Sequence, residues 1–251
     1  MLSQQTQRFL KYIPKRIYIC EKLNNMRKYT FLFVIVTALF VSCKTDKKKE
    51  TQPEVTELTI LEKVANAHGI EKWNNLKELE FTFNVDRDTT HFERSWIWNT
   101  KTNEVTSMSA TDTLSYNRKS VDSLSVKADG GFINDKYWLL APYNLVWDKA
   151  NFSFEHNTEA ISPISNAPMQ KLTIVYGNEG GYTPGDAYDF YFGDDYVIKE
   201  WVFRKGNAPE PSTMTTWEDY MDADGLKIAR MHQNKDGSFK LYFTNIKAVT
   251  E

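Results

Sequence analysis

The four histidines are the side chains best suited to metal or acid–base chemistry, and they lie far apart, at His68, His91, His156 and His232. A zinc site needs three or four converging ligands, which usually appear as a short motif such as HExxH or CxxC. Neither motif is present in the sequence. We therefore predict no metal site, and we expect the histidines at the surface or in a helix cap.

Two acidic, glycine-containing segments resemble ligand loops only in part. Residues 222–225 begin like a calcium loop, but Leu226 stands where the next oxygen ligand belongs and no glutamate closes the loop. Residues 177–182 are glycine-rich but include an acidic side chain, which would repel a phosphate. Both segments are predicted to be turns, and no cofactor is expected. A carboxylate pair for glycoside hydrolysis stays open as an alternative, because the separation of two acids cannot be read from a sequence.

One cysteine lies in a context that favours covalent attachment of lipid. Residues 31–41 form an uncharged run of eleven residues that follows Arg27 and Lys28 and leads into Val41-Ser42-Cys43. This is the length of a signal-peptide core, whereas about 20 residues are needed to span a bilayer. The three residues resemble the end of the lipobox that bacterial signal peptidase II recognises, although Phe40 stands where Leu is preferred. Cys43 is therefore the predicted lipidation site.

These signals predict four segments. Residues 1–25 are expected to be an extension upstream of a true start at Met26, residues 26–42 a lipoprotein signal peptide, residues 43–55 the lipidated cysteine with a polar tether, and residues 56–251 one domain. An uncleaved membrane anchor or a buried helix is the alternative for the apolar run, and the polar residues that follow it argue against both. Residues 1–42 contain seven Lys and Arg and one acid, which leaves a net charge of −8 for the rest and disfavours a nucleic-acid partner.

The elements that must position any site are mostly strands. A helix is predicted over residues 56–68, because apolar residues recur at helical spacing and Thr59 with Glu62 forms a capping box. From Leu79 the apolar period changes to two, which indicates a strand with one wet face, and a second strand carries Phe92, Trp96 and Trp98. Further strands are predicted at 104–110, 112–117, 123–128, 170–176, 187–192, 196–204, 213–221, 226–233 and 238–248. Their spacing favours an antiparallel meander, and residues 129–168 fit no element.

Three segments carry a resemblance to a known fold family: residues 67–73, residues 133–143, and residues 217–226. They resemble proteins of the LolA/LolB type, which are periplasmic lipoprotein carriers and relatives of unknown function. The resemblance covers about residues 56–249. It implies a mainly β (α+β) fold, in which a curved antiparallel half-barrel sheet of about ten or eleven strands has an N-terminal helix packed on its concave side.

The same resemblance implies an apolar hollow between sheet and helix, in which an acyl chain gains about 0.8 kcal/mol for each buried CH₂ group. For any single aromatic residue, plain core packing is the better interpretation, and only their number favours a cavity. The candidate lining residues are Phe81, Phe83, Arg94, Trp96, Trp98, Tyr188, Phe190, Trp201, Phe203 and Trp217.

Arg94 is the exception among these residues because it is charged. It shares the parity of Phe92, Trp96 and Trp98, so it is expected on the apolar face, where it would need a carboxylate, a carbonyl or a ligand headgroup. The alternative is that Arg94 lies near a strand end and reaches water with its stem packed. We prefer this alternative, because a single bulge breaks strand parity.

Together these patterns predict a non-catalytic lipoprotein of a Gram-negative envelope, held at a membrane through Cys43, most simply the outer membrane on its periplasmic or outer face. Its hollow would bind a lipid or an acylated protein segment. The first alternative is a structural or interaction lipoprotein, with a filled core, that docks a protein or glycan. The second is an envelope hydrolase that uses two acids.

Overall fold

The computed structural model describes residues 57–181 and 183–251. They belong to one compact unit, Val55–Glu251, and the second unit, Met1–Glu54, lies outside the described residues. The predicted signal peptide, Cys43 and the tether therefore lie outside them too. Within the described residues, no helix is both long and apolar enough to cross a membrane.

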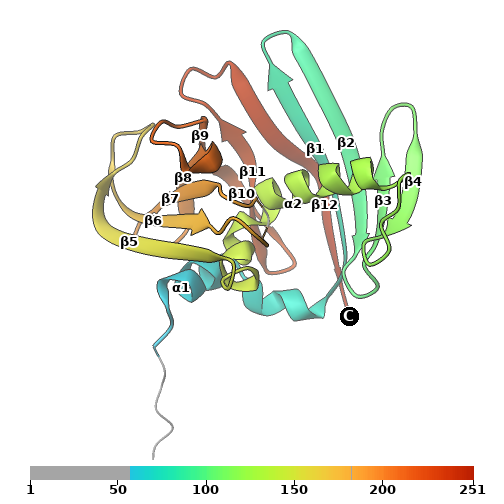
Figure 1. Ribbon diagram of the computed structural model, residues 1–251, viewed down its shortest axis with the longest axis horizontal. Helices are drawn as coiled ribbons and strands as arrows, with labels where there is room; N and C mark the ends of the chain where they lie inside the picture. Colours follow the sequence, from blue (N-terminus) through green and yellow to red (C-terminus); the bar gives the residue numbers. More distant parts are fainter. Residues whose placement is uncertain (1–56, 182) are drawn as a thin grey trace, which may run out of the picture. The chain divides into compact units, whose positions relative to one another are not determined.

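The described residues form twelve strands in two antiparallel sheets that do not close into a barrel (Figure 1). The seven-stranded sheet has the order β10-β11-β12-β1-β2-β3-β4. Its strands are β1 (Leu76–Arg87), β2 (Thr90–Asn99), β3 (Glu104–Met108), β4 (Thr113–Asn117), β10 (Glu218–Ala223), β11 (Leu226–Gln233) and β12 (Phe239–Thr250).

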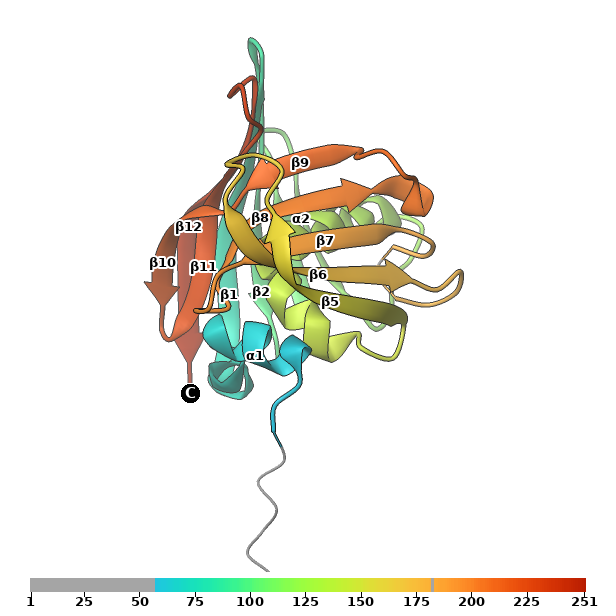
Figure 2. The same ribbon diagram turned by 90° about the vertical axis from the view of Figure 1, so that its left-hand side faces the viewer.

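The five-stranded sheet has the order β5-β6-β7-β8-β9, which Figure 2 shows stacked one above the other. Its strands are β5 (Phe152–Ile161), β6 (Pro168–Tyr176), β7 (Ala187–Phe192), β8 (Ile198–Arg204) and β9 (Thr213–Thr216). The helical elements are α1 (Ile60–Ala67), η1 (Ile70–Asn75), α2 (Val126–Trp147) and η2 (Lys205–Asn207). The predicted mainly β, antiparallel class is confirmed.

The two sheets meet where the chain passes directly from β9 to β10. Only Trp217 separates these strands, so the segment predicted as one strand over residues 213–221 is shared between the sheets. The backbone N–H of Gln233 on β11 donates to the Thr216 hydroxyl on β9 at 3.2 Å. The two sheets are thereby linked side by side at this corner, and their strands elsewhere diverge.

The predicted N-terminal helix is present as α1. The hydroxyl of Thr59 accepts a hydrogen bond from the Glu62 backbone N–H at 3.3 Å, and the Glu62 carboxylate accepts one from the Thr59 backbone N–H at 2.8 Å. This is the capping box read from the sequence. Leu61 and Val64 are buried in the same core cluster as Tyr137 of α2.

Helix α2 and strand β5 are elements that the sequence did not predict, and residues 126–128, expected to end a strand, begin α2 instead. The helix lies between the two sheets (Figure 1) and buries side chains on both of its sides: Tyr137 packs in one core cluster and Phe132 in the other. A helix that buries side chains on opposite sides shows no single apolar stripe with a 3.6-residue period. Pro142 inside it and the non-helical backbone of Leu140 (φ −124°, ψ 24°) mark a kink.

A buried carboxylate holds α2 against the seven-stranded sheet. Asp135, which is fully buried, accepts two hydrogen bonds from the Arg94 guanidinium, at 2.5 and 2.6 Å, and one from the Trp96 indole N–H at 2.8 Å. Arg94 also donates to the Gly131 carbonyl at 3.2 Å. Our preferred prediction, that Arg94 reaches water with only its stem packed, is therefore wrong. A carboxylate partner, the other interpretation, is what the structure contains.

Replacement of Asp135 by Asn should lower the free energy of unfolding by about 3 kcal/mol, because Arg94 and Trp96 lose their charged acceptor in a mostly buried site. Asp129→Asn is the matched control, because Asp129 lies on α2 as Asp135 does. Asp129 pairs with Arg118, whose side chain is 24% exposed, as that of Arg94 is. That single-contact pair should cost about 1 kcal/mol or less. Urea unfolding followed by tryptophan fluorescence measures both, and equal losses would contradict the anchoring role.

Candidate functional site

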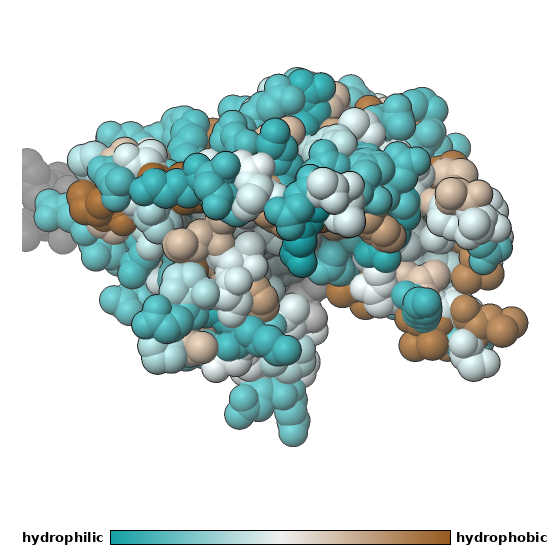
Figure 3. Space-filling view, turned by 90° about the horizontal axis from the view of Figure 1, so that it is seen from above, coloured by the Kyte–Doolittle hydropathy of each residue, from teal (hydrophilic) through white to brown (hydrophobic). Residues whose placement is uncertain are grey.

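A cleft of about 1250 Å³ opens between the two sheets, and α2 forms one of its walls. Seen from above, the molecule is hollowed between the part built on the five-stranded sheet and the part built on β1–β4 (Figure 3). One wall comes from β1 and β12, with Phe83, Val85 and Leu241, and the facing wall from β7, β8 and β9. The volume exceeds the roughly 300–1000 Å³ of common small-molecule sites.

The structure brings four of the predicted lining residues to this cleft. These are Phe83, Tyr188, Trp201 and Phe203. The other six do not line it and instead fill the core or, for Arg94, anchor α2: Phe81, Arg94, Trp96, Trp98, Phe190 and Trp217. Residues of one strand parity share a face, but only some of them border the cleft.

Sequence reasoning missed the wall that α2 supplies. Ile133, Tyr137 and Trp138 line the cleft from this helix, together with Gly130 near its N-terminus. Ile133 and Tyr137 are four residues apart, which places both on one helix face. That spacing was the available signal, and the two glycines and Pro142 concealed it by suggesting a loop.

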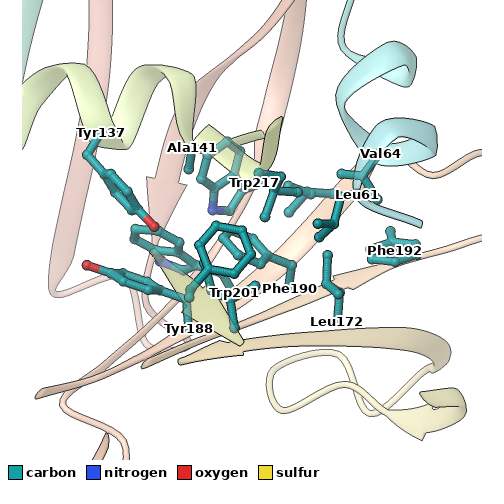
Figure 4. Packing of buried hydrophobic residues seen from close by; sticks show 14 of the residues in the cluster. Leu61, Val64, Tyr137, Ala141, Leu172, Tyr188, Phe190, Phe192, Trp201 and Trp217 are labelled. Atoms are coloured by element: carbon teal, nitrogen blue, oxygen red, sulfur yellow. The ribbon is translucent and has the colours of Figure 1, made fainter. Parts of the chain in front are cut away.

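The interior of the cleft is neutral and aromatic. The Tyr188 hydroxyl lies 3.0 Å from the Thr183 hydroxyl, and burial raises the pKa of the Tyr188 phenol well above its usual range. Figure 4 shows the Tyr137 and Tyr188 hydroxyl groups on the same side of the aromatic cluster. The charged members of the lining lie on the β1–β2 and β11–β12 turns, and they are Arg87, Asp88, Lys235 and Asp236. An apolar ligand would therefore meet charge only at the rim.

One lip of the cleft is fixed by a buried glutamate. Pro163 and Ile164, in the turn between β5 and β6, belong to the cleft lining. Glu200 on β8 is only 3% exposed and accepts hydrogen bonds from the backbone N–H groups of Ile164, at 2.8 Å, and Ser165, at 3.0 Å. Hydrogen bonds to a carboxylate are stronger than neutral ones, so this turn is held in place.

Two of the four histidines are in the interior, where the sequence had placed them at the surface or in caps. His68 does cap α1, but it is fully buried, and its Nδ1 lies 2.8 Å from the Val64 carbonyl oxygen. His232 is fully buried among aromatic rings, with the backbone of Thr216 beside it. Burial lowers the pKa of His68 to about 4 and the pKa of His232 to about 3. A hydrogen bond with the Thr216 backbone raises the pKa of His232, but by less than burial lowers it.

The acidic turn over residues 222–225 is a β-hairpin turn, as predicted. The Asp222 carboxylate accepts a hydrogen bond from the Gly225 backbone N–H at 2.9 Å, between β10 and β11. Within residues 57–181 and 183–251, no three His, Cys, Asp or Glu side chains are grouped so as to hold a metal ion.

No family model and no curated protein matches the chain. Solved structures of similar fold include a LolA superfamily protein of Nitrosomonas europaea, with a TM-score of 0.47, 10% identity and coverage of 76% of this chain and 93% of that one. A DUF1329 family protein of Desulfovibrio piger has a TM-score of 0.44, 9% identity and coverage of 75% and 91%. A domain of Vibrio parahaemolyticus named for outer membrane lipoprotein sorting has a TM-score of 0.40, 10% identity and coverage of 75% and 93%.

These three neighbours are named for the DUF1329 family, the LolA superfamily and outer membrane lipoprotein sorting. At identities of 10% or less and TM-scores below 0.5, nothing about function follows from them.

The buried histidines should make the protein acid-sensitive well above the pH at which carboxylates titrate. The unfolded chain binds protons at histidine near pH 6.5, whereas the native protein excludes them until about pH 4 at His68 and pH 3 at His232. The contribution of the two neutral histidines to the free energy of unfolding is therefore fully present above about pH 7, and it is lost as the pH falls below that value. For each pH unit of that fall, each histidine lowers the free energy of unfolding by up to about 1.4 kcal/mol.

Urea unfolding at pH 7.5, 6.0 and 5.0 measures this loss, and His232→Phe should remove about half of it. His91→Ala is the control, since His91 is exposed beside Asp86 and its pKa is raised, which gives the opposite sign. A loss of stability that is unchanged in His232→Phe would show that His232 is not the titrating group.

Proposed function

We propose that this chain is a non-catalytic lipoprotein of a Gram-negative envelope that is held at a membrane through lipid on Cys43. Its cleft binds a hydrophobic ligand, either a lipid or an acylated protein segment. The proposal rests on one observation above the others: the neutral, aromatic cleft of about 1250 Å³ between the two sheets.

The energetic support comes from the lining. Phe83, Tyr188, Trp201 and Phe203 present aromatic faces to the cleft, and burying each CH₂ group of an acyl chain against such surface gains about 0.8 kcal/mol. Ten methylene groups would gain about 8 kcal/mol, which is of the order that micromolar binding requires. Polar headgroups would remain at the charged rim.

The membrane attachment is supported by the sequence alone. A signal-peptide core that ends at Val41-Ser42-Cys43 is followed by a polar run from Lys44 to Glu50. Several acyl chains on one cysteine would give stable membrane attachment, whereas one chain gives only marginal binding. A tethered protein cannot shuttle between membranes, so the proposed role is that of an acceptor or receptor at one membrane.

A filled-core interaction protein is the second candidate, and one observation favours it. Five of the ten candidate lining residues pack in the two core clusters instead, and they are Phe81, Trp96, Trp98, Phe190 and Trp217. The open cleft favours ligand binding over this candidate. A hydrolase is weaker still, because a general acid needs a raised pKa, and hydrogen bonds from Ser238 lower the pKa of the rim residue Asp236.

Filling the cleft should abolish ligand binding without unfolding the protein. Gly130 lines the cleft, and a Cβ atom added to it would meet nothing within 4 Å. Gly130→Phe should weaken binding of a fluorescent fatty acid by tenfold or more. Gly130→Ala is the matched control, which should bind normally and gain about 0.5–1 kcal/mol of stability from helix propensity.

Native mass spectrometry of the full chain gives the independent reading, since a retained lipid would be seen directly. Wild-type protein that carries no lipid and binds no fluorescent fatty acid would refute the proposed function.

The anchor has its own test. Growth with an alkyne-labelled fatty acid should label the protein in cells, and Cys43→Ser should abolish both the label and the membrane association. Cys20→Ser is the control and should change neither, because Cys20 precedes the proposed start at Met26. Label that persists in Cys43→Ser would overturn Cys43 as the lipidation site.

A further inference from the structure

Several polar atoms are buried together beside the cleft without hydrogen-bond partners. They are the Trp201 and Trp217 indole Nε1 atoms, the Thr215 hydroxyl, and one ring nitrogen of His232, whose other nitrogen is close to the Thr216 backbone. Each of these four residues is at most 2% exposed. Buried polar groups in native proteins are normally hydrogen-bonded, so four orphans in one place need an explanation.

The four side chains form one contiguous group. The ring centroids of Trp201 and Trp217 are 5.5 Å apart, and those of Trp217 and His232 are 4.5 Å apart. Thr215 on β9 is the register partner of Trp201 on β8. Figure 4 shows the two indoles next to one another between α2 and the five-stranded sheet. We call this group the donor cluster.

Of the four residues in the donor cluster only Trp201 lines the cleft, and Trp138 packs against both Trp201 and His232. Trp138 lines the cleft, and its ring centroid lies 4.4 Å from that of Trp201 and 5.5 Å from that of His232. Two residues later, Leu140 has non-helical backbone angles, and Pro142 follows it. A helix kinked at this point lacks part of its hydrogen-bond ladder, so the turn that carries Trp138 is where α2 can shift.

The chemistry of the cluster defines what would fit it. The two indole N–H groups are donors, a neutral imidazole has one donor N–H and one acceptor nitrogen, and the threonine hydroxyl is both donor and acceptor. None of the four carries a charge at neutral pH, since burial keeps His232 unprotonated. A free carboxylate would be buried here without a cation, which is costly. A neutral carbonyl matches the excess of donors.

We propose that the donor cluster is a closed subsite for a neutral carbonyl group, such as the ester or amide carbonyl of an acylated ligand, and that movement of Trp138 joins it to the cleft. The inference rests on the proposed function, because the acyl chain would occupy the cleft described above. In the closed state the unpaired groups destabilise the protein, and a ligand carbonyl would relieve that cost.

Thr215 is the sharpest probe. The edge-to-face ring contacts offer the indole N–H groups an aromatic face as a weak partner, whereas the hydroxyl has no such substitute. Thr215→Val keeps the shape and the strand propensity and removes only the polar atom. Thr106→Val is the matched control, since Thr106 lies on β3, does not line the cleft and has its hydroxyl 2.8 Å from the Ser115 hydroxyl.

The experiment measures displacement of N-phenyl-1-naphthylamine from the full chain by methyl laurate and, separately, by dodecane. The wild-type protein should bind methyl laurate more tightly than dodecane. Thr215→Val should weaken methyl laurate by about three- to tenfold, the value of one hydrogen bond, and leave dodecane unchanged. Thr106→Val should change the affinity for neither ligand. Trp217→Phe, which removes a different donor, should also weaken methyl laurate selectively.

The ligand-free protein supplies a second readout. Removal of an unpaired buried hydroxyl should raise the Tm of Thr215→Val by about 2–4 °C. The protein could bind dodecane while Thr215→Val and Trp217→Phe both leave the ratio of the methyl laurate affinity to the dodecane affinity unchanged. That result would overturn the carbonyl subsite and leave the cleft function intact. A fall in the Tm of Thr215→Val would also overturn it. Failure of the wild-type protein to bind either probe would instead refute the proposed function.

Discussion

The carboxylate of Asp135 is the contact on which the arrangement of the two sheets depends. It is fully buried and accepts hydrogen bonds from Arg94, Trp96 and the neighbouring Asn134 side chain. These bonds fix both the position of α2 on the seven-stranded sheet and its rotation about its own axis. With Asp135 turned toward that sheet, Tyr137 and Trp138 are turned toward the five-stranded sheet and the cleft. A buried charge is tolerated here because the guanidinium is bidentate and the remaining carboxylate positions are filled.

A helix held between two sheets gives the molecule two cores and one opening. Tyr137 and Leu145 of α2 contribute to the core on the five-stranded sheet, and Phe132 and Tyr143 to the core on the seven-stranded sheet. The sheets are linked at Trp217 and diverge away from it. Side chains fill the space near the link, where the distance is short, and leave a cleft farther out. The same aromatic residue types therefore serve as core near the link and as ligand surface beyond it.

The kink in α2 lies directly after Trp138, the residue whose movement is proposed to accompany ligand binding. Pro142 has no backbone N–H to donate, so the helix cannot stay regular there, and Leu140 takes up the change of direction. Trp138 lies just before this break and contacts both the cleft and the cluster that contains His232. In the closed state, one imidazole nitrogen and the indole nitrogens of this cluster forgo hydrogen bonds. Interiors that are optimised only for stability rarely keep such groups.

The sequence alone determined the elements whose signals are local. The capping box of Thr59 and Glu62 begins α1, and the period-two alternation from Leu79 defines β1, because both patterns depend only on neighbouring residues. The acidic hairpin turn at Asp222 and the antiparallel class follow for the same reason. Of the ten candidate lining residues, four do line the cleft, Phe83 among them.

Only the tertiary structure decided the rest. Helix α2 is buried on both sides, so it shows no amphipathic period, and its glycines and Pro142 resemble a loop. The partner of Arg94 lies 41 residues away, on an element that the sequence did not reveal. Parity assigns a residue to a face of a sheet, but the distance to the opposite sheet decides whether that face is filled or open. This distance is set by the packing of α2 and by the link at Trp217, neither of which is a property of neighbouring residues.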